Sequence, residues 1–119
     1  MGTQSKGKRG EAAAVAALLK AGYEIIARNW RCAIGEIDLI AKHRQDIVFV
    51  EVRSRSDSLD AALESINTRK RNRLMQLAQF YLDQHGLEDS PFRIDAVAVA
   101  FEPGSRTPKV EIIEDAVGW

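Results

Sequence analysis

Residues 34–55 read IGEIDLIAKHRQDIVFVEVRSR, two apolar runs separated by a short polar segment. Runs of this length that are rich in Ile, Val and Phe predict buried β-strands. Both runs nevertheless contain charges, Glu36 and Asp38 in the first and Glu51 and Arg53 in the second. Because an ionised side chain is costly to bury, these positions need a physical explanation.

The two runs predict an antiparallel hairpin closed by a short loop around residues 44–45. In this register Asp38 lies directly across from Glu51, and Glu36 lies across from Arg53, with Cβ atoms about 4.5–5.5 Å apart. Two carboxylates this close repel each other, so one takes up a proton unless a cation lies between them. Oxygen ligands are those that Mg²⁺ prefers, and a divalent metal ion is therefore the expected cation.

Alternation along a strand predicts which side chains share a face. In the first run, Ile37 and Leu39 are expected on the face opposite Asp38. In the second run, one face is uninterrupted and apolar, formed by Val48, Val50 and Val52. The opposite face of this run begins apolar and becomes ionic from Glu51 onward.

The remaining elements are predicted from apolar spacing and from turn residues. Helices are expected over residues 7–21 and within residues 60–85. Further strands are expected over residues 23–30, 92–101 and 109–115, the last at a sheet edge. The order αβββαββ predicts an α/β (α+β) sandwich, a mixed central sheet flanked by helices.

The chain has 119 residues, enough for one domain, expected over residues 7–119 after a disordered N-terminus at residues 1–6. Its 17 basic and 17 acidic residues cancel, which argues against a histone-like protein that binds nucleic acid through bulk charge. The single cysteine, Cys32, and the two histidines leave no internal disulfide and no zinc-ligand spacing. With neither a signal peptide nor a membrane-spanning run, the chain is expected to be cytoplasmic.

Each predicted helix also carries a charge on the face turned toward the sheet. In the first helix the apolar stripe of Val15, Leu18 and Leu19 continues back one turn to Glu11. In the second helix the apolar stripe includes Lys70. Together with the strands, four elements therefore direct charges inward.

Each charge taken alone has a structural explanation. Glu11 is favourable near a helix N-terminus, and Lys70 can extend past the core to solvent. Arg53 can form a cross-strand ion pair with Glu36, and Asp95 is expected to be a hydrogen-bonded structural acid near a strand start. What favours a functional site is the convergence of acids and bases on neighbouring elements.

Four motifs together resemble those of the YraN-like family of small bacterial proteins. They are G-x-x-G-E-x-x-A from Gly7, G-E-I-D-L-I-A from Gly35, F-V-E-V-R-x-R from Phe49, and K-x-x-R-L from Lys70. That family is related to the archaeal Holliday-junction resolvases and the PD-(D/E)xK nuclease superfamily. The resemblance runs from Gly7 to about Phe101. It implies a restriction-endonuclease-like fold and a nuclease dependent on Mg²⁺ (or Mn²⁺), acting on DNA, with branched or structured DNA as the expected substrate.

The resemblance also assigns roles to individual residues. Asp38 matches the metal-binding aspartate of the superfamily, Glu51 the acid of its E-x-K half-motif, and Glu11 the acid that resolvase-like members contribute from their first helix. The resemblance implies that Asp38 and Glu51, with Glu11 directly or through water, hold one or two Mg²⁺ ions. Ile37 stands where the superfamily has Pro, a residue that takes no part in the chemistry. Arg53 occupies the position of the catalytic lysine, and an arginine stays protonated, so it cannot act as a base.

Arg53 and Lys70 are therefore predicted to contact the scissile phosphate, with Lys70 supplying the missing ammonium group. The flanking nucleic-acid backbone is expected to contact Lys8, Arg9, Arg55, Arg69, Arg71 and Arg73. Such contacts carry no sequence information and weaken with salt. A homodimer is expected if two strands are cut. The alternative function is a catalytically impaired nuclease-fold module that binds nucleic acid.

Overall fold

The computed structural model describes residues 6–116, and their side chains from residue 8 onward. In chain order the elements are α1 (Lys6–Lys20), β1 (Glu24–Cys32), β2 (Gly35–His43), β3 (Asp46–Arg55), α2 (Leu59–Glu64), α3 (Thr68–Gln84), β4 (Phe92–Ala100) and β5 (Lys109–Ile113). The strands form one sheet in the order β1-β2-β3-β4-β5, parallel between β3 and β4 and antiparallel elsewhere. The predicted mixed sheet is confirmed, with β5 at its edge.

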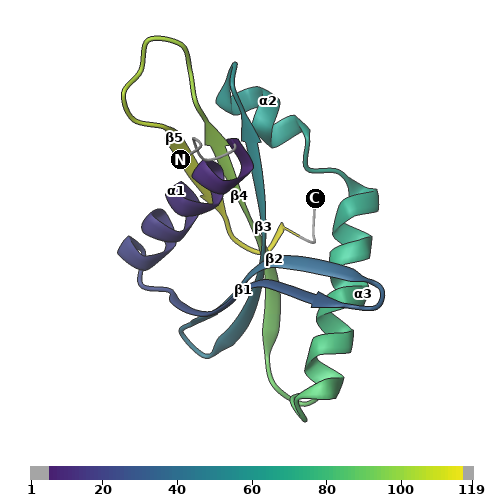
Figure 1. Cartoon of the computed structure of the whole chain (residues 1–119). Helices are drawn as coiled ribbons and strands as arrows, with labels where there is room; N and C mark the ends of the chain where they lie inside the picture. The colour runs from purple at the N-terminus through teal and green to yellow at the C-terminus, as the bar shows by residue number, and fades with distance from the viewer. Residues whose placement is uncertain (1–5, 117–119) are drawn as a thin grey trace, which may run out of the picture.

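Helices cover both faces of the sheet, α1 on one and α3 on the other (Figure 1). Alternation along β3 explains the two cores. Val48 and Val50 pack in the cluster that contains Leu18 of α1, whereas Phe49 packs in the cluster that contains Leu77 of α3. The uninterrupted apolar face predicted for β3 is confirmed, with Val52 half-buried against the first cluster.

The single long helix predicted within residues 60–85 is wrong, because the chain forms two helices there. The Asn67 side chain accepts a hydrogen bond from the Lys70 backbone N–H at 3.0 Å and caps the start of α3. Ser65 ends α2 and donates its hydroxyl to the Ala62 carbonyl at 2.7 Å. Short polar side chains that bond the local backbone favour helix ends over helix interiors, and this interrupts the apolar periodicity.

Two expectations concern the ends of the chain. Residues 1–5 of the expected disordered N-terminus lie outside the described residues, and Lys6 already begins α1. Over residues 6–116, no helix is long and apolar enough to cross a membrane.

The β2–β3 hairpin has the predicted register, and its pairing stops just before the charged residues. Residues pair from His43 with Asp46 to Leu39 with Val50. Beyond this point β2 pairs only with β1, and β3 continues along β4 as far as Arg55. The two strands therefore diverge where Asp38 and Glu51 were predicted to face each other directly.

Strict alternation along β2 fails at Asp38. Ile37 lies in the cluster beneath α3, whereas Leu39 lies in the cluster beneath α1, so the predicted common face of these two residues is wrong. In the β1–β2 register, Asn29 and Asp38 lie between the pairs Arg28–Leu39 and Trp30–Ile37. The φ of Asn29, 52°, is in the left-handed region. A local distortion of both strands at this step changes which face each side chain occupies.

Gly10 allows α1 to approach β3 closely. A Cβ at this position would lie 1.8 Å from Ser54 Oγ and 3.0 Å from Ser54 Cβ. We therefore expect Gly10→Ala to destabilise the fold by about 1–3 kcal/mol, as for an overpacked core, in urea unfolding. In a Ser54→Ala background the same change should cost less, because the shortest contact is gone. Equal costs in the two backgrounds would contradict this contact.

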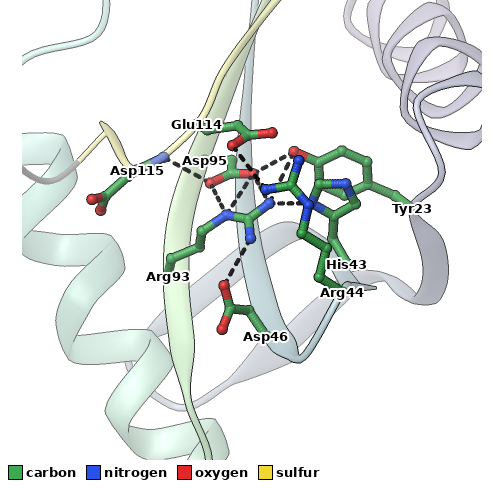
Figure 2. Close-up of polar contacts among 8 residues, drawn as sticks. All are labelled: Tyr23, His43, Arg44, Asp46, Arg93, Asp95, Glu114 and Asp115. Atoms are coloured by element: carbon green, nitrogen blue, oxygen red, sulfur yellow. Dashed lines mark hydrogen bonds and ion pairs between the residues drawn. The ribbon is translucent and has the colours of Figure 1, made fainter.

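A buried polar cluster lies between β3, β4 and the end of α1 (Figure 2). Asp95 is fully buried and accepts hydrogen bonds from Tyr23 Oη at 2.6 Å, Arg93 Nε at 3.0 Å and the Asp115 backbone N–H at 2.9 Å. Arg93 also donates to Asp46 at 2.8 Å, and His43 stacks on the Tyr23 ring. The prediction that Asp95 is a hydrogen-bonded structural acid is confirmed.

Candidate functional site

The gap between β2 and β3 opens into a pocket of about 340 Å³ that α3 covers. Its ionisable lining residues are Glu36, Asp38, Glu51, Arg53, Lys70 and Arg73. Valines of β3 and leucines of α3 form the apolar part of the wall. The four residues predicted from the sequence to be catalytic therefore line the same pocket.

Asp38 lies where β2 leaves β3. Its Oδ2 accepts a hydrogen bond from the Val52 backbone N–H at 2.9 Å, so the carboxylate caps β3 where the ladder ends. Burial raises the pKa of Asp38, the Val52 N–H opposes this effect, and the charges of Glu51 and Glu11 raise the pKa further. A carboxyl group in this setting favours either a proton or a nearby cation.

Glu51 and Arg53 lie on the same face of β3 and form an ion pair. Arg53 Nη2 lies 2.6 Å from Glu51 Oε1, with the side chains 24% and 13% exposed. The other carboxylate oxygen, Glu51 Oε2, and the Arg53 Nε are buried, and neither has a hydrogen-bond partner within residues 6–116. A buried polar atom without a partner is unfavourable, so Glu51 offers an oxygen that a cation can satisfy.

Glu36 does not form the predicted ion pair with Arg53. Glu36 Oε2 instead lies 3.0 Å from Arg31 Nε across the β1–β2 hairpin, and both side chains are exposed. The reason is the divergence of β2 from β3, which removes the expected cross-strand neighbour. The prediction of a structural ion pair between Glu36 and Arg53 is therefore wrong.

Lys70 and Arg73 extend from α3 into the pocket wall. Burial lowers the pKa of Lys70, the charges of Arg53 and Arg55 lower it further, and Glu51 opposes them. The guanidinium of Arg73 donates to the Ile34 carbonyl oxygen and so ties the β1–β2 turn to α3. The predicted orientation of Lys70 toward the strands agrees with this geometry, although the helical stripe used to predict it crosses a helix break.

Glu11 approaches this region from the opposite face of the sheet. It is half-buried on α1, accepts a hydrogen bond from Asn29 Nδ2 at 3.0 Å, and raises the pKa of Asp38. It does not line the pocket. Leu19, predicted to be part of the same helical stripe, is 55% exposed, whereas Ala14 is fully buried.

Most of the predicted phosphate-contacting side chains are exposed. Those of Lys8, Arg9, Arg55, Arg69 and Arg73 reach the surface. Arg71 is buried, and its guanidinium donates to the Ala116 carbonyl at 2.9 Å and to Thr68 Oγ1 at 3.0 Å. The prediction that Arg71 contacts nucleic acid is therefore wrong, because its donors hold the C-terminal segment against α3.

The carboxylates of the pocket suit a hard cation that needs few protein ligands. Among residues 6–116, no three His, Cys, Asp or Glu side chains are grouped closely enough to hold a metal ion by themselves. Mg²⁺ is usually bound by one or two carboxylates and keeps several waters. Asp38 and Glu51, whose buried oxygen has no partner in the part of the chain that the structure describes, match this requirement better than they match a zinc or calcium site.

Asp38 should make the stability of the metal-free chain depend on pH. Its pKa is raised above the ordinary value of 3.8, so between these two values the folded chain binds more protons than the unfolded chain. Stability therefore falls as pH rises through this window, by at most about 1.4 kcal/mol per pH unit from this group. We expect the stability of Asp38→Asn, measured by urea unfolding with EDTA, not to show this fall as pH rises. The same pH slope in both proteins would contradict the shift.

Comparison with known proteins places the chain in a family. The profile described as uncharacterised protein family UPF0102 matches residues 10–99. A UPF0102 protein of Moorella thermoacetica is 44% identical over 117 residues, which cover 98% of each chain. The chain belongs to family UPF0102. A UPF0102 protein of Chloroflexus aurantiacus is 48% identical over 113 residues, covering 94% of this chain and 92% of the relative. The UPF0102 match includes all the ionisable pocket residues, and the resemblance to the YraN-like family is confirmed.

Two features of this UPF0102 protein's pocket were missed in the sequence. The first is the contact of Arg73 with the Ile34 carbonyl, because Arg73 was assigned only to the outer basic surface. The second is the direct pairing of Arg53 with Glu51. Their spacing of two residues on one strand was a signal for it, since such residues share a face.

Proposed function

We propose that this UPF0102 protein is a metal-dependent nuclease that hydrolyses phosphodiester bonds of DNA, with a restriction-endonuclease-like arrangement of the PD-(D/E)xK type. The observation that carries the proposal is the carboxylate pair of the pocket. Asp38 has a raised pKa, and Glu51, which lines the same pocket, has a buried oxygen with no hydrogen-bond partner among the described residues. Both groups gain from a divalent cation, and cationic side chains that can bind a phosphate line the same pocket.

Asp38 and Glu51 would hold Mg²⁺ or Mn²⁺, and Glu11 would support Asp38 from the α1 side. When bound, the ion supplies activation of the attacking water and compensates charge on the phosphate. The Val52 N–H keeps one oxygen of Asp38 in place, so the carboxylate is oriented before any ligand binds.

Arg53 and Lys70 would contact the scissile phosphate. The guanidinium can offset charge that develops in the transition state but cannot remove a proton. Lys70 has a lowered pKa, so it gives up a proton more readily than an ordinary lysine. Arg73 adds a further positive charge at the same wall.

The flanking backbone would contact the exposed basic side chains on α1, β3 and α3, namely Lys8, Arg9, Arg55 and Arg69. Phosphate contacts of this kind predict strong salt dependence and selection of DNA by shape, such as a branch, rather than by sequence. Cleavage of two strands would require a second copy, and a homodimer belongs to the proposal for this reason. The cytoplasmic location likewise stays a prediction.

A second candidate function is a nucleic-acid-binding module that has lost the reaction. It is favoured by Arg53, which replaces the catalytic lysine of the related nucleases and is already paired with Glu51. In this case the carboxylates would only hold structure. The two functions differ in whether the pocket binds a divalent cation.

Metal-dependent stabilisation distinguishes them. If the pocket binds Mg²⁺ with a dissociation constant near 1 mM, then 10 mM Mg²⁺ should stabilise the protein by about 1.4 kcal/mol, or raise the melting temperature by roughly 4–6 °C. Asp38→Asn should lose this increase, in thermal unfolding at constant ionic strength. An equal increase in both proteins, or none in either, would reject the metal site and favour the binding module.

A further inference from the structure

Arg53 is held by a carboxylate that the proposed function assigns to a metal ion. Its one hydrogen bond within the described residues goes to Glu51 Oε1, and its Nε is buried without a partner. A guanidinium has five N–H donors in a fixed fork, and within residues 6–116 Arg53 uses only one of them, toward Glu51. The contact therefore neutralises the Glu51 carboxylate but engages only one N–H of the Arg53 guanidinium.

We propose that Arg53 is a counter-ion switch that makes the binding of a divalent cation and of a phosphodiester mutually dependent. In the metal-free protein Arg53 neutralises Glu51. When a cation takes its place beside Glu51, Arg53 turns to a phosphate oxygen of the substrate. This inference rests on the proposed function, because it concerns the same pocket.

Electrostatics explain why each ligand binds more weakly when the other is absent. A cation that approaches Glu51 meets the positive charge of Arg53 at 2.6 Å from the carboxylate oxygen. Arg53 cannot move freely into the rest of the pocket, because Lys70 lines the same pocket and its positive charge repels the guanidinium. Burial and then the charge of Arg53 lower the pKa of Lys70. An anion between the cationic side chains of Arg53 and Lys70 removes this repulsion. A phosphodiester therefore lowers the cost of releasing Glu51, and the released Glu51 favours the cation.

The converse follows from the same contact. Without the cation, a phosphate that attracts Arg53 leaves Glu51 half-buried, charged and unpaired beside Asp38, which is unfavourable. Thermodynamic linkage requires both effects to have the same size. We expect the cation to tighten DNA binding at least tenfold, which corresponds to about 1.4 kcal/mol.

The test uses Mg²⁺ and a short phosphorothioate DNA duplex that resists cleavage. Calorimetry measures Mg²⁺ affinity without DNA, and fluorescence anisotropy measures DNA affinity with Mg²⁺ or EDTA at constant ionic strength. Arg53→Met removes the switch, whereas Arg53→Lys keeps a cation at the same place. Arg31→Met is the matched control, because Arg31 pairs with Glu36 at the exposed rim of the same pocket. Asp38→Asn corrects for Mg²⁺ that binds the DNA alone.

Arg53→Met should bind Mg²⁺ at least tenfold more tightly than wild type without DNA, and Mg²⁺ should change its DNA affinity by less than about threefold. Arg53→Lys and Arg31→Met should keep most of the coupling. If Arg53→Met retains both the wild-type Mg²⁺ affinity and the wild-type coupling, the switch is wrong and the metal site stands. If wild type shows no Mg²⁺ binding that depends on Asp38, the proposed function and the switch both fail.

Discussion

Glu51→Gln is expected to lower Mg²⁺-dependent DNA cleavage by a factor on the order of 10³ or more, as for loss of a group that acts in a catalytic unit. The amide keeps the shape of the side chain but removes the charge that would hold the cation, and it leaves Arg53 without a negatively charged partner. The measurement is the initial rate on labelled linear, flapped and four-way DNAs, each with Mg²⁺ or Mn²⁺. The panel also shows which DNA shape is preferred.

Glu36→Gln is the matched control for this variant. Glu36 lines the same pocket, but it is exposed and paired with Arg31 at the rim. Its replacement should leave the rate within about tenfold of wild type, since a screened surface pair contributes little. Cleavage that persists undiminished in Glu51→Gln would point to a contaminating nuclease or to another site, and it would reject the role given to Glu51.

Asp95→Asn is expected to destabilise the fold by about 3 kcal/mol or more, because it removes the fully buried carboxylate charge that pairs with Arg93. The carboxylate accepts hydrogen bonds from Tyr23, Arg93 and the Asp115 backbone. An asparagine accepts through one oxygen only, and its NH₂ group would face other donors. The free energy of unfolding in urea, measured at neutral pH, provides the test.

Asp46→Asn offers the comparison within the same cluster. Asp46 also pairs with Arg93, at 2.8 Å, but its side chain is 32% exposed, against 0% for Asp95. Water can replace part of the interaction with Arg93 that Asp46→Asn removes, so we expect the free energy of unfolding to fall by about 1 kcal/mol or less. Equal costs for the two variants would show that burial of Asp95 does not determine the energy of the cluster.

Local patterns predicted most of the fold. Loop length and alternation predicted the β2–β3 register and the apolar face of Val48 and Val50, because both depend on near neighbours in the chain. The break between α2 and α3 was missed, since Ile66 preserves the apolar spacing across it. The helix-capping side chain of Asn67 is the signal in the sequence that marks this break.

The sequence predicted which residues line the site but not which of them contact one another. Asp38, Glu51 and Lys70 line the same pocket, as their positions on strands and helix suggested. The partner of Arg53 was not predicted, because it depends on how far β2 follows β3 before the strands diverge. The burial of Arg71 was also missed, since a run of basic residues does not reveal which of them faces the C-terminal segment.

The most direct test of the metal site is a crystal soaked in Mn²⁺, with diffraction recorded at the manganese absorption edge. The account predicts an anomalous peak in contact with the carboxylates of both Asp38 and Glu51, with the Arg53 guanidinium displaced from Glu51. Crystals of Glu51→Gln should lack the peak. If a crystal soaked to saturation with Mn²⁺ shows no anomalous peak between these carboxylates, although both side chains are ordered, the proposed metal site is contradicted.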